Sequence, residues 1–338
     1  MSHLERAYLN ALVDILETGE HRQDRTGTGT LSVFGVNMKF DLSRGFPAVT
    51  TKKLAWRAVV SELLWFIMGS GDERKLKELL HGDPNSDKKT IWSDNESADY
   101  WQRRKKFKGD LGRVYGVQWR TWRAPVFGAN RMGVKHIDQL QILINGIKED
   151  PYSRRHIISA WNPGELELMS LPPCHMMAQF YVSTLTQDEI NNRYMDYRST
   201  CSDKEKAAMD VEREGRAKTI DDLKAFGLPT GRLSCQMYQR SADFGLGIPF
   251  NIASYALFTH MLAQTCDLDV GTLTICVGDA HIYVNHIDQI KEQLRRTPFD
   301  VPVLKLNPAI KDITKFTMDD IELINYQCHP TIAMPMAV

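Results

Sequence analysis

Hydrophobic residues recur at helical spacing in four segments of the chain. Residues 3–19 carry apolar side chains three and four positions apart and end at Gly19, which predicts an amphipathic helix. Residues 136–149 show the same kind of spacing. The segments 56–68 and 252–263 are apolar almost all round, so they predict helices that are buried on nearly every side.

Other segments show the composition and alternation that are typical of strands. Residues 31–41 alternate most clearly between apolar and polar positions. Further strands are predicted at 156–161, 180–183, 233–238 and 270–277. Strands mixed with two very apolar helices are compatible with a layered α and β domain, but they do not determine its topology.

Two segments are more polar than the rest. Residues 81–109 contain a few aromatic side chains and are predicted to form a small exposed subdomain. Residues 184–232 are charged and separate two predicted strands, so we interpret them as a helical insertion in a hairpin, with a solvated helix at 203–218. An inert insertion is favoured over a partner-binding arm, because long loops are often tolerated. RNA binding by 203–218 is an alternative that nothing in the sequence supports.

Composition narrows the class of protein. The chain has 338 residues, and its 42 basic and 42 acidic residues balance, which argues against a generally basic nucleic-acid-binding protein. No apolar run approaches the roughly 20 residues that span a bilayer, so no membrane contact is expected. The six cysteines lack CxxC spacing, so no metal site is predicted. With no signal peptide in view, free thiols fit a cytoplasmic protein best.

Three features carry candidate chemistry. Cys174 follows two prolines and precedes His175, and a thiol at such a break, with Arg240 nearby in space, is a candidate thiolate nucleophile. The alternative is a small buried structural cysteine. Glu62 lies inside an apolar helix, where a carboxylate is paired, protonated or functional. The Gly- and Thr-rich loop that contains Arg25 offers anion-binding groups, although a plain β-turn is the alternative.

Short motifs in a fixed order resemble the thymidylate synthase family. They are Asp24-Arg-Thr-Gly-Thr-Gly, Phe46-Pro-Ala-Val-Thr-Thr-Lys-Lys, Glu62-Leu-Leu-Trp-Phe, Gly109-Asp-Leu-Gly-Arg-Val-Tyr-Gly, Ser153-Arg-Arg, Pro172-Pro-Cys-His, Tyr238-Gln-Arg-Ser, Leu246-Gly-Ile-Pro-Phe-Asn-Ile-Ala-Ser-Tyr, Gly278-Asp-Ala-His-Ile-Tyr and Ala333-Met-Pro-Met-Ala-Val. The resemblance covers nearly the whole chain except 184–232. It implies a single α+β domain over 1–338, in which a mixed β-sheet is layered with helices, and dimerisation through the sheet face.

The resemblance also implies a reaction. Members of this family convert dUMP to dTMP, with 5,10-methylenetetrahydrofolate as both carbon and hydride donor and no metal. Cys174 would attack C6 of the uracil, Glu62 would organise proton transfer, and Tyr115 would assist removal of the C5 proton. The implied catalytic residues are Cys174, Glu62, Tyr115, His175 and Asn251.

Binding residues follow from the same resemblance. The implied dUMP ligands are Arg25, Arg154, Arg155, Gln239, Arg240, Ser241, Asp243, Asn251, His281 and Tyr283. Arg154 and Arg155 would come from the other subunit of a homodimer. The implied folate ligands are Lys52, Trp92, Asn95, Asp243, Leu246, Gly247, Phe250 and Val338, with Val338 closing over the site.

One departure and one rival reaction stand out. Arg113 lies two residues before Tyr115, where the family usually has proline. The rival is a pyrimidine hydroxymethylase, which uses the same covalent steps but lets water capture the methylene. Asn251 favours uracil over cytosine, because its amide can donate to O4 and accept from N3–H. A dUMP hydroxymethylase therefore remains an alternative.

Overall fold

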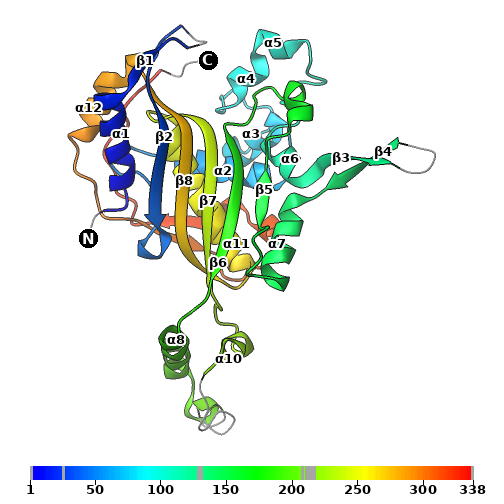
Figure 1. The fold of residues 1–338 in the computed structure, drawn as a ribbon, viewed down its shortest axis with the longest axis vertical. Helices are drawn as coiled ribbons and strands as arrows, with labels where there is room; N and C mark the ends of the chain where they lie inside the picture. The colour runs from blue at the N-terminus through cyan, green and yellow to red at the C-terminus, as the bar shows by residue number, and fades with distance from the viewer. Residues whose placement is uncertain (1–2, 25–26, 128–131, 207–208, 210–217, 336–338) are drawn as a thin grey trace.

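A six-stranded mixed sheet forms the centre of the protein (Figure 1). The structure, a computed structural model, describes residues 3–24, 27–127, 132–206, 209 and 218–335. The strands follow one another across the sheet in the order β1 (Glu20–Arg22), β2 (Thr30–Asp41), β8 (Asp269–Tyr283), β7 (Arg232–Asp243), β6 (His175–Ser183) and β5 (Ile157–Ser159). β7 and β8 are parallel, and the other neighbours in this sheet are antiparallel.

Helices cover one face of this sheet, which confirms the predicted α+β arrangement. The most buried helix, α11 (Gly247–Thr265), packs on β7 and β8, and α2 (Trp56–Ile67) packs against α11. Figure 1 shows both behind the central strands, with α1 (Arg6–Thr18) alongside β2. α11 is apolar all round because it lies between the sheet and a second layer of helix.

The other face of the sheet leaves apolar side chains exposed. Alternation along β6 and β7 turns Met177, Tyr181 and Tyr238 away from the face where Ala178, Phe180 and Met237 are buried. Tyr181 is 67% exposed and Phe34 in β2 is 82% exposed. Tyr181 is paired with Ser234 near the insertion, whereas Phe34 is paired with Asp279 toward the other end of the sheet, so the exposed side chains are spread over this face.

The insertion between β6 and β7 has a small core of its own. It contains α8 (Gln187–Thr200) and α10 (Ile220–Ala225), which project from one end of the sheet in Figure 1. Its buried residues are Leu185, Ile190, Tyr194, Met209 and Leu223. Most of the helix predicted at 203–218 lies outside the described residues. At the base of the insertion, β6 and β7 remain paired as far as Ser183 and Arg232.

The remaining elements surround this core. The segment predicted as an exposed subdomain contains two short helices, and its Trp92 and Trp101 are buried. The other helices and strands are α3 (Glu73–His81), α4 (Ser93–Ser97), α5 (Asp99–Gln102), α6 (Tyr115–Thr121), α7 (Gln139–Glu149), α12 (Ile287–Leu294), β3 (Trp122–Phe127), β4 (Met132–Ile137), β9 (Val303–Leu306) and β10 (Ile321–Ile324). The fold also contains short 3-10 helices. One of them, η2 (Pro163–Leu168), precedes Cys174 and is discussed below. None of the described helices is long and apolar enough to cross a bilayer.

Candidate active site

The topology of the sheet gathers the candidate residues at one edge, by which we mean the end of the sheet where β7 and β8 finish and β6 begins. Because β7 and β8 are parallel, their carboxyl ends meet, and β6 begins at the same edge because it runs antiparallel to β7. In the register, His175 lies opposite Gln239 and Asp243 lies opposite His281. Cys174, which directly precedes β6, therefore lies near the carboxyl ends of β7 and β8, although these segments are far apart in the sequence.

Cys174 is held against Arg240. The backbone N–H of Arg240 donates to the carbonyl of Cys174 at 2.8 Å, and its Nη2 lies 3.7 Å from the thiol sulfur. Burial raises the pKa of the Cys174 thiol above its ordinary value, while the guanidinium of Arg240 and the hydroxyl of Tyr115 partly oppose this rise. A proton on the thiol must therefore leave before the sulfur can act as a nucleophile.

Tyr115 and His175 form a stacked pair beside the thiol. The hydroxyl of Tyr115 accepts the backbone N–H of Cys174 at 2.7 Å, and its ring stacks on His175 at 4.0 Å. Neighbouring residues of an extended chain point to opposite sides, so His175 faces inward, where its Nδ1 lies 2.9 Å from the hydroxyl of Tyr255. Burial lowers the pKa of His175 to about 3. His175 is therefore neutral and buried, and its imidazole bonds to Tyr255 rather than to the Cys174 thiol.

Glu62 projects from α2 and accepts the indole N–H of Trp92 at 2.7 Å. Its withdrawal from water raises the pKa to about 7, and the bond from Trp92 partly opposes this rise. The Trp92 ring in turn packs edge-on against Tyr115, with centroids 5.7 Å apart. Two aromatic rings, Trp92 and Tyr115, thus connect Glu62 to the nucleophile. The pKa of Glu62 is suited to giving and taking a proton near neutrality.

An amide pair lies at the end of β7. Gln239 is buried, and its Nε2 donates to Asn251 Oδ1 and to the carbonyl of Ser241, both at 3.1 Å. Within the part of the chain that the structure describes, Oε1 of Gln239 is buried without a hydrogen-bond partner. The bond to Gln239 fixes the orientation of the Asn251 amide, whose NH₂ group remains available as a donor.

Asp243 organises the turn into α11. Its Oδ1 accepts the backbone N–H groups of Gly245 at 2.7 Å and Leu246 at 3.2 Å. Lys52 is buried and donates to the carbonyl of Gly245. Burial lowers the pKa of Lys52 to about 8, although Asp243 and Glu5 oppose the change. The turn carries Leu246 and Gly247, and Phe250 follows within the first turn of α11.

The end of β8 meets the Gly- and Thr-rich loop. The N–H of Gly29 donates to Asp24 at 2.7 Å, and the N–H of Val284 donates to the carbonyl of Gly29 at 3.1 Å. The loop therefore adjoins Tyr283, whose ring packs against His281 with centroids 5.3 Å apart. Arg25 itself lies outside the described residues.

Some predicted site residues are not brought to this edge by any contact among the described residues. Arg154 and Arg155 are exposed between α7 and β5, and neither forms an ion pair with a described residue. Asn95 lies in α4 and is partly exposed. Val338 lies outside the described residues, but the chain leading to it reaches the site, where the carbonyl oxygen of Pro335 lies 2.7 Å from Nε2 of the buried His286.

The sequence argument missed two supporting residues. Tyr255 holds His175, and His286 holds the C-terminal segment. Both are polar side chains in apolar surroundings, and a buried hydroxyl or imidazole normally needs a partner. That signal identifies them as candidates for a hydrogen-bond network, but the partner becomes visible only in the fold.

Comparison with known proteins agrees with this geometry. Residues 6–338 match the family model described as thymidylate synthase. The chain is 43% identical over 342 residues to the bifunctional dihydrofolate reductase-thymidylate synthase of Zea mays, and 45% identical over 341 residues to bifunctional dihydrofolate reductase-thymidylate synthase 2 of Arabidopsis thaliana. Each match covers 99% of this chain, but only 55% and 51% of those relatives, so the chain spans about half their length. The chain belongs to the thymidylate synthase family.

Proposed function

We propose that this chain catalyses the reductive methylation of dUMP to dTMP, with 5,10-methylenetetrahydrofolate as the donor of both the carbon and the hydride. The observation that carries the proposal is the position of Arg240 against Cys174 at the edge of the sheet, 3.7 Å from the sulfur, in a chain of this family. Tyr115, Glu62 and Asn251 supply the remaining groups.

The thiolate of Cys174 adds to C6 of the uracil ring. The electron pair of the C5–C6 double bond then moves toward C5 and O4, which makes C5 a nucleophile for the methylene carbon of the folate. Arg240 assists in two ways, because its charge favours the thiolate and its fork of N–H groups suits a phosphate dianion. Pro172 and Pro173 accept two of its N–H groups through their carbonyls, which leaves the remaining donors for an anion.

Asn251 would recognise the base, and Glu62 and Tyr115 would carry out the proton transfers. The Asn251 amide, oriented by Gln239, would pair with O4 and N3–H of the base. Glu62, with a pKa of about 7, would move protons at O4 and at the folate through water. The Tyr115 hydroxyl accepts the N–H of Cys174 with one lone pair, and its second lone pair remains to assist removal of the C5 proton.

The folate would lie between Trp92 and the first turn of α11. Leu246, Gly247 and Phe250 offer a largely apolar wall, Asp243 offers a carboxylate for the pterin, and Lys52 offers positive charge for the glutamate tail. After the C5 proton is removed, the bond from the methylene carbon to the folate nitrogen would break and leave an exocyclic methylene on the base. The tetrahydrofolate, still in the site, would transfer a hydride to this methylene and become dihydrofolate, and the C5–C6 double bond would re-form as the Cys174 thiolate is released. Excluding water at that stage separates methylation from hydroxymethylation.

A homodimer completes this proposal. The open sheet face carries the exposed side chains Tyr181 and Tyr238, and it also has a hollow of about 300 Å³ lined by Gln179, Ser234 and Thr274, among others. A second copy of the chain covering this face would bury them. Arg154 and Arg155, which lack ion-pair partners among the described residues, would then serve the phosphate site of that second copy.

Turnover with defined substrates tests the proposal. Purified protein is mixed with dUMP and methylenetetrahydrofolate, dihydrofolate is followed by its absorbance, and the nucleotide is identified by mass. We expect dTMP and dihydrofolate in equal amounts, no turnover for Cys174→Ala, and full turnover for Cys201→Ala, a control at a free cysteine in the insertion. A nucleotide heavier by a hydroxymethyl group, without dihydrofolate, would instead identify a dUMP hydroxymethylase.

A further inference from the structure

Arg113 lies at the centre of a polar network that the reaction above does not use. Its side chain is 13% exposed, and its Nε donates to Glu165, which is 10% exposed, at 2.6 Å. Its Nη2 donates to the carbonyl of Thr121 at 2.7 Å. Glu165 also pairs with Arg123 at 3.5 Å. A carboxylate and a guanidinium this far from water are stable only when each has partners.

The network includes the backbone of Arg113 as well as its side chain. The N–H of Arg113 donates to the carbonyl of Leu168 at 2.8 Å, and its own carbonyl accepts Nε2 of Gln118 at 3.0 Å. The same Nε2 lies 2.8 Å from Glu165. Burial acts to raise the pKa of Glu165, but the bonds from Arg113 and Gln118 hold it below the ordinary value. Glu165 is therefore ionised and bound on several sides.

These contacts fix the two chain segments that meet at the nucleophile. On one side, Arg113 immediately precedes Val114 and Tyr115, where α6 begins. On the other side, Glu165 and Leu168 belong to η2, which leads through residues 169–173 to Cys174. The two segments meet again at 2.7 Å between the hydroxyl of Tyr115 and the N–H of Cys174. The Arg113–Glu165 pair thus joins the two segments two residues before Tyr115 on one side and nine residues before Cys174 on the other.

We propose that Arg113 is a positioning residue that sets the Tyr115 hydroxyl against Cys174, acting through its bonds to Glu165, Thr121 and Leu168. This role rests on the proposed function for its catalytic consequence. The geometry it controls is the contact between Tyr115 and the nucleophile itself, so the inference can be tested without a substrate.

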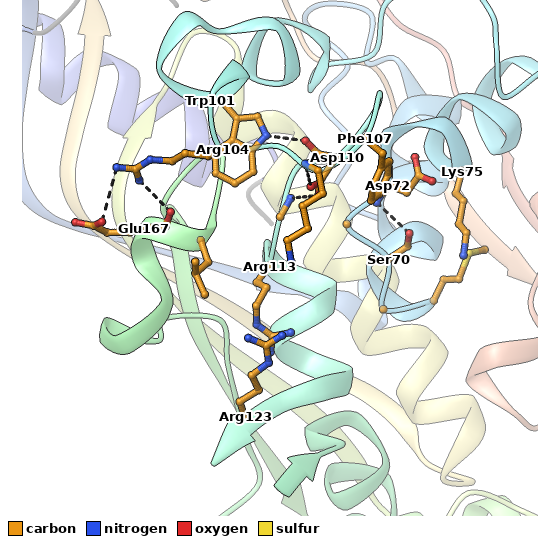
Figure 2. A pocket seen from close by; sticks show the side chains of 16 residues that line it. Ser70, Asp72, Lys75, Trp101, Arg104, Phe107, Asp110, Arg113, Arg123 and Glu167 are labelled. Atoms are coloured by element: carbon orange, nitrogen blue, oxygen red, sulfur yellow. Dashed lines mark hydrogen bonds and ion pairs between the residues drawn. The ribbon is translucent and has the colours of Figure 1, made fainter. Parts of the chain in front are cut away.

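A second ion pair at the same cavity provides a matched control. Arg113, Arg123, Arg104 and Glu167 all line a cavity of about 800 Å³ (Figure 2). Figure 2 shows Arg113 and Arg123 reaching toward each other and the Arg104–Glu167 pair apart from them. That pair is open to water, with side chains 52% and 87% exposed, at 3.7 Å. Exposed pairs of this kind contribute little to stability.

The first experiment measures the alkylation rate of Cys174 by iodoacetamide at pH 8, with the modified peptide identified by mass. The Tyr115 hydroxyl lowers the pKa of the thiol, so loss of its alignment should slow alkylation. We expect Arg113→Met to slow the reaction by roughly threefold or more, because a higher thiol pKa leaves less thiolate to react at pH 8. Arg113→Lys, which keeps the charge but not the fork, should recover part of the rate, and Arg104→Met should match the wild type.

A double-mutant cycle separates positioning from general structural damage. If Arg113 acts through Tyr115, Arg113→Met should change alkylation by less than about twofold in a Tyr115→Phe background. Arg113→Met should likewise lower kcat for dTMP formation much less in the Tyr115→Phe background than in the wild-type background. The KM for dUMP should not change. Glu165→Gln replaces Arg113→Met in the cycle if the latter does not fold. Equal effects in both backgrounds, or an Arg104→Met effect as large as that of Arg113→Met, would overturn the inference. Absence of dUMP turnover in the wild type would refute the proposed function and leave the alkylation test intact.

Discussion

The guanidinium of Arg240 lies 3.7 Å from the sulfur of Cys174, and it is held there by the chain that precedes that sulfur. Its Nε donates to the carbonyl of Pro173 at 2.9 Å and its Nη2 to the carbonyl of Pro172 at 3.1 Å. The two prolines fix their own φ angles, so the carbonyls are presented in a restricted geometry. The nucleophile and its counter-charge therefore form one unit that is held together by hydrogen bonds within the chain.

Arg240→Met should make Cys174 less reactive. Burial already raises the pKa of the thiol, and Arg240 is the largest opposing influence, so its loss should raise the pKa further. We expect the pH profile of iodoacetamide alkylation to move to higher pH. Alkylation at pH 8 should fall by roughly tenfold for each pH unit that the profile moves. Arg232→Met, at the opposite end of β7, serves as the control. Superimposable profiles for wild type and Arg240→Met would show that the charge does not act on the thiol.

Glu62→Gln should stabilise the protein above neutral pH but not below pH 5. The carboxyl has a pKa of about 7 in the folded protein and an ordinary value near 4.5 when unfolded. Below the pKa that the carboxyl has in the unfolded protein, it is protonated in both the folded and the unfolded protein, so it costs the fold no stability. As the pH rises from 4.5 through 7, the unfolded state releases the proton first and folding loses stability.

The size of this effect follows from the two pKa values. A difference of about 2.5 pKa units corresponds to ~3 kcal/mol at most. Urea unfolding at pH 5 and at pH 8 gives the unfolding free energies of wild type and Glu62→Gln. The effect is the amount by which the difference between the two proteins changes from pH 5 to pH 8. A Glu62→Gln advantage that is the same at both pH values would contradict the raised pKa.

Removal of residues 188–228 should leave the catalytic domain intact. The insertion buries its side chains in its own cluster, and Ser183 pairs with Arg232 where it leaves the sheet. The deletion keeps 184–187 and 229–231 as a loop and removes the ion pairs from Glu189 to Arg232 and from Arg193 to Asp269, which are surface pairs of small value. Equal kcat for both forms, with a melting temperature within a few degrees, is the expected result. An insoluble or inactive deletion would show that the insertion supports the sheet.

Mixing two inactive variants should restore activity if the site is shared between subunits. Cys174→Ala lacks the nucleophile, and a chain with both Arg154→Gln and Arg155→Gln lacks the donated guanidiniums. After random reassortment, half of the dimers are mixed and each has one intact site, so about one quarter of the wild-type activity should return. Each variant alone is the control. No recovery, after reassortment is verified by native mass spectrometry, would place both arginines outside the partner's site.

The sequence predicted the individual elements better than their assembly. α2 and α11 were recognisable because burial on every side removes polar residues, and β2 because one of its faces is buried. The parallel pairing of β7 with β8 could not be recognised from the sequence, since it depends on how α11 crosses between the two strands. The resemblance named Cys174, Glu62 and Arg240 as site residues, but it had no means of orienting their neighbours.

His175 and Arg113 show why the finer arrangement needs the fold. Adjacency to Cys174 suggested that His175 helps to activate the thiol, yet the alternation of an extended strand turns it toward Tyr255. Arg113 looked only like a departure from a family proline. Its partner Glu165 is 52 residues away, and a pairing over that distance has no local signature in the sequence.

The bond between His286 and Pro335 has a practical consequence for anyone who expresses this protein. It fastens the end of the chain beside Asp243, whose Oδ1 lies 4.0 Å from the other nitrogen of the same imidazole. An affinity tag attached after Val338 would be separated by only three residues from Pro335, which is anchored next to Asp243, a proposed folate ligand. Protein for kinetic work should therefore carry its tag at the N-terminus, and slow turnover by a C-terminally tagged preparation should be attributed to the tag first.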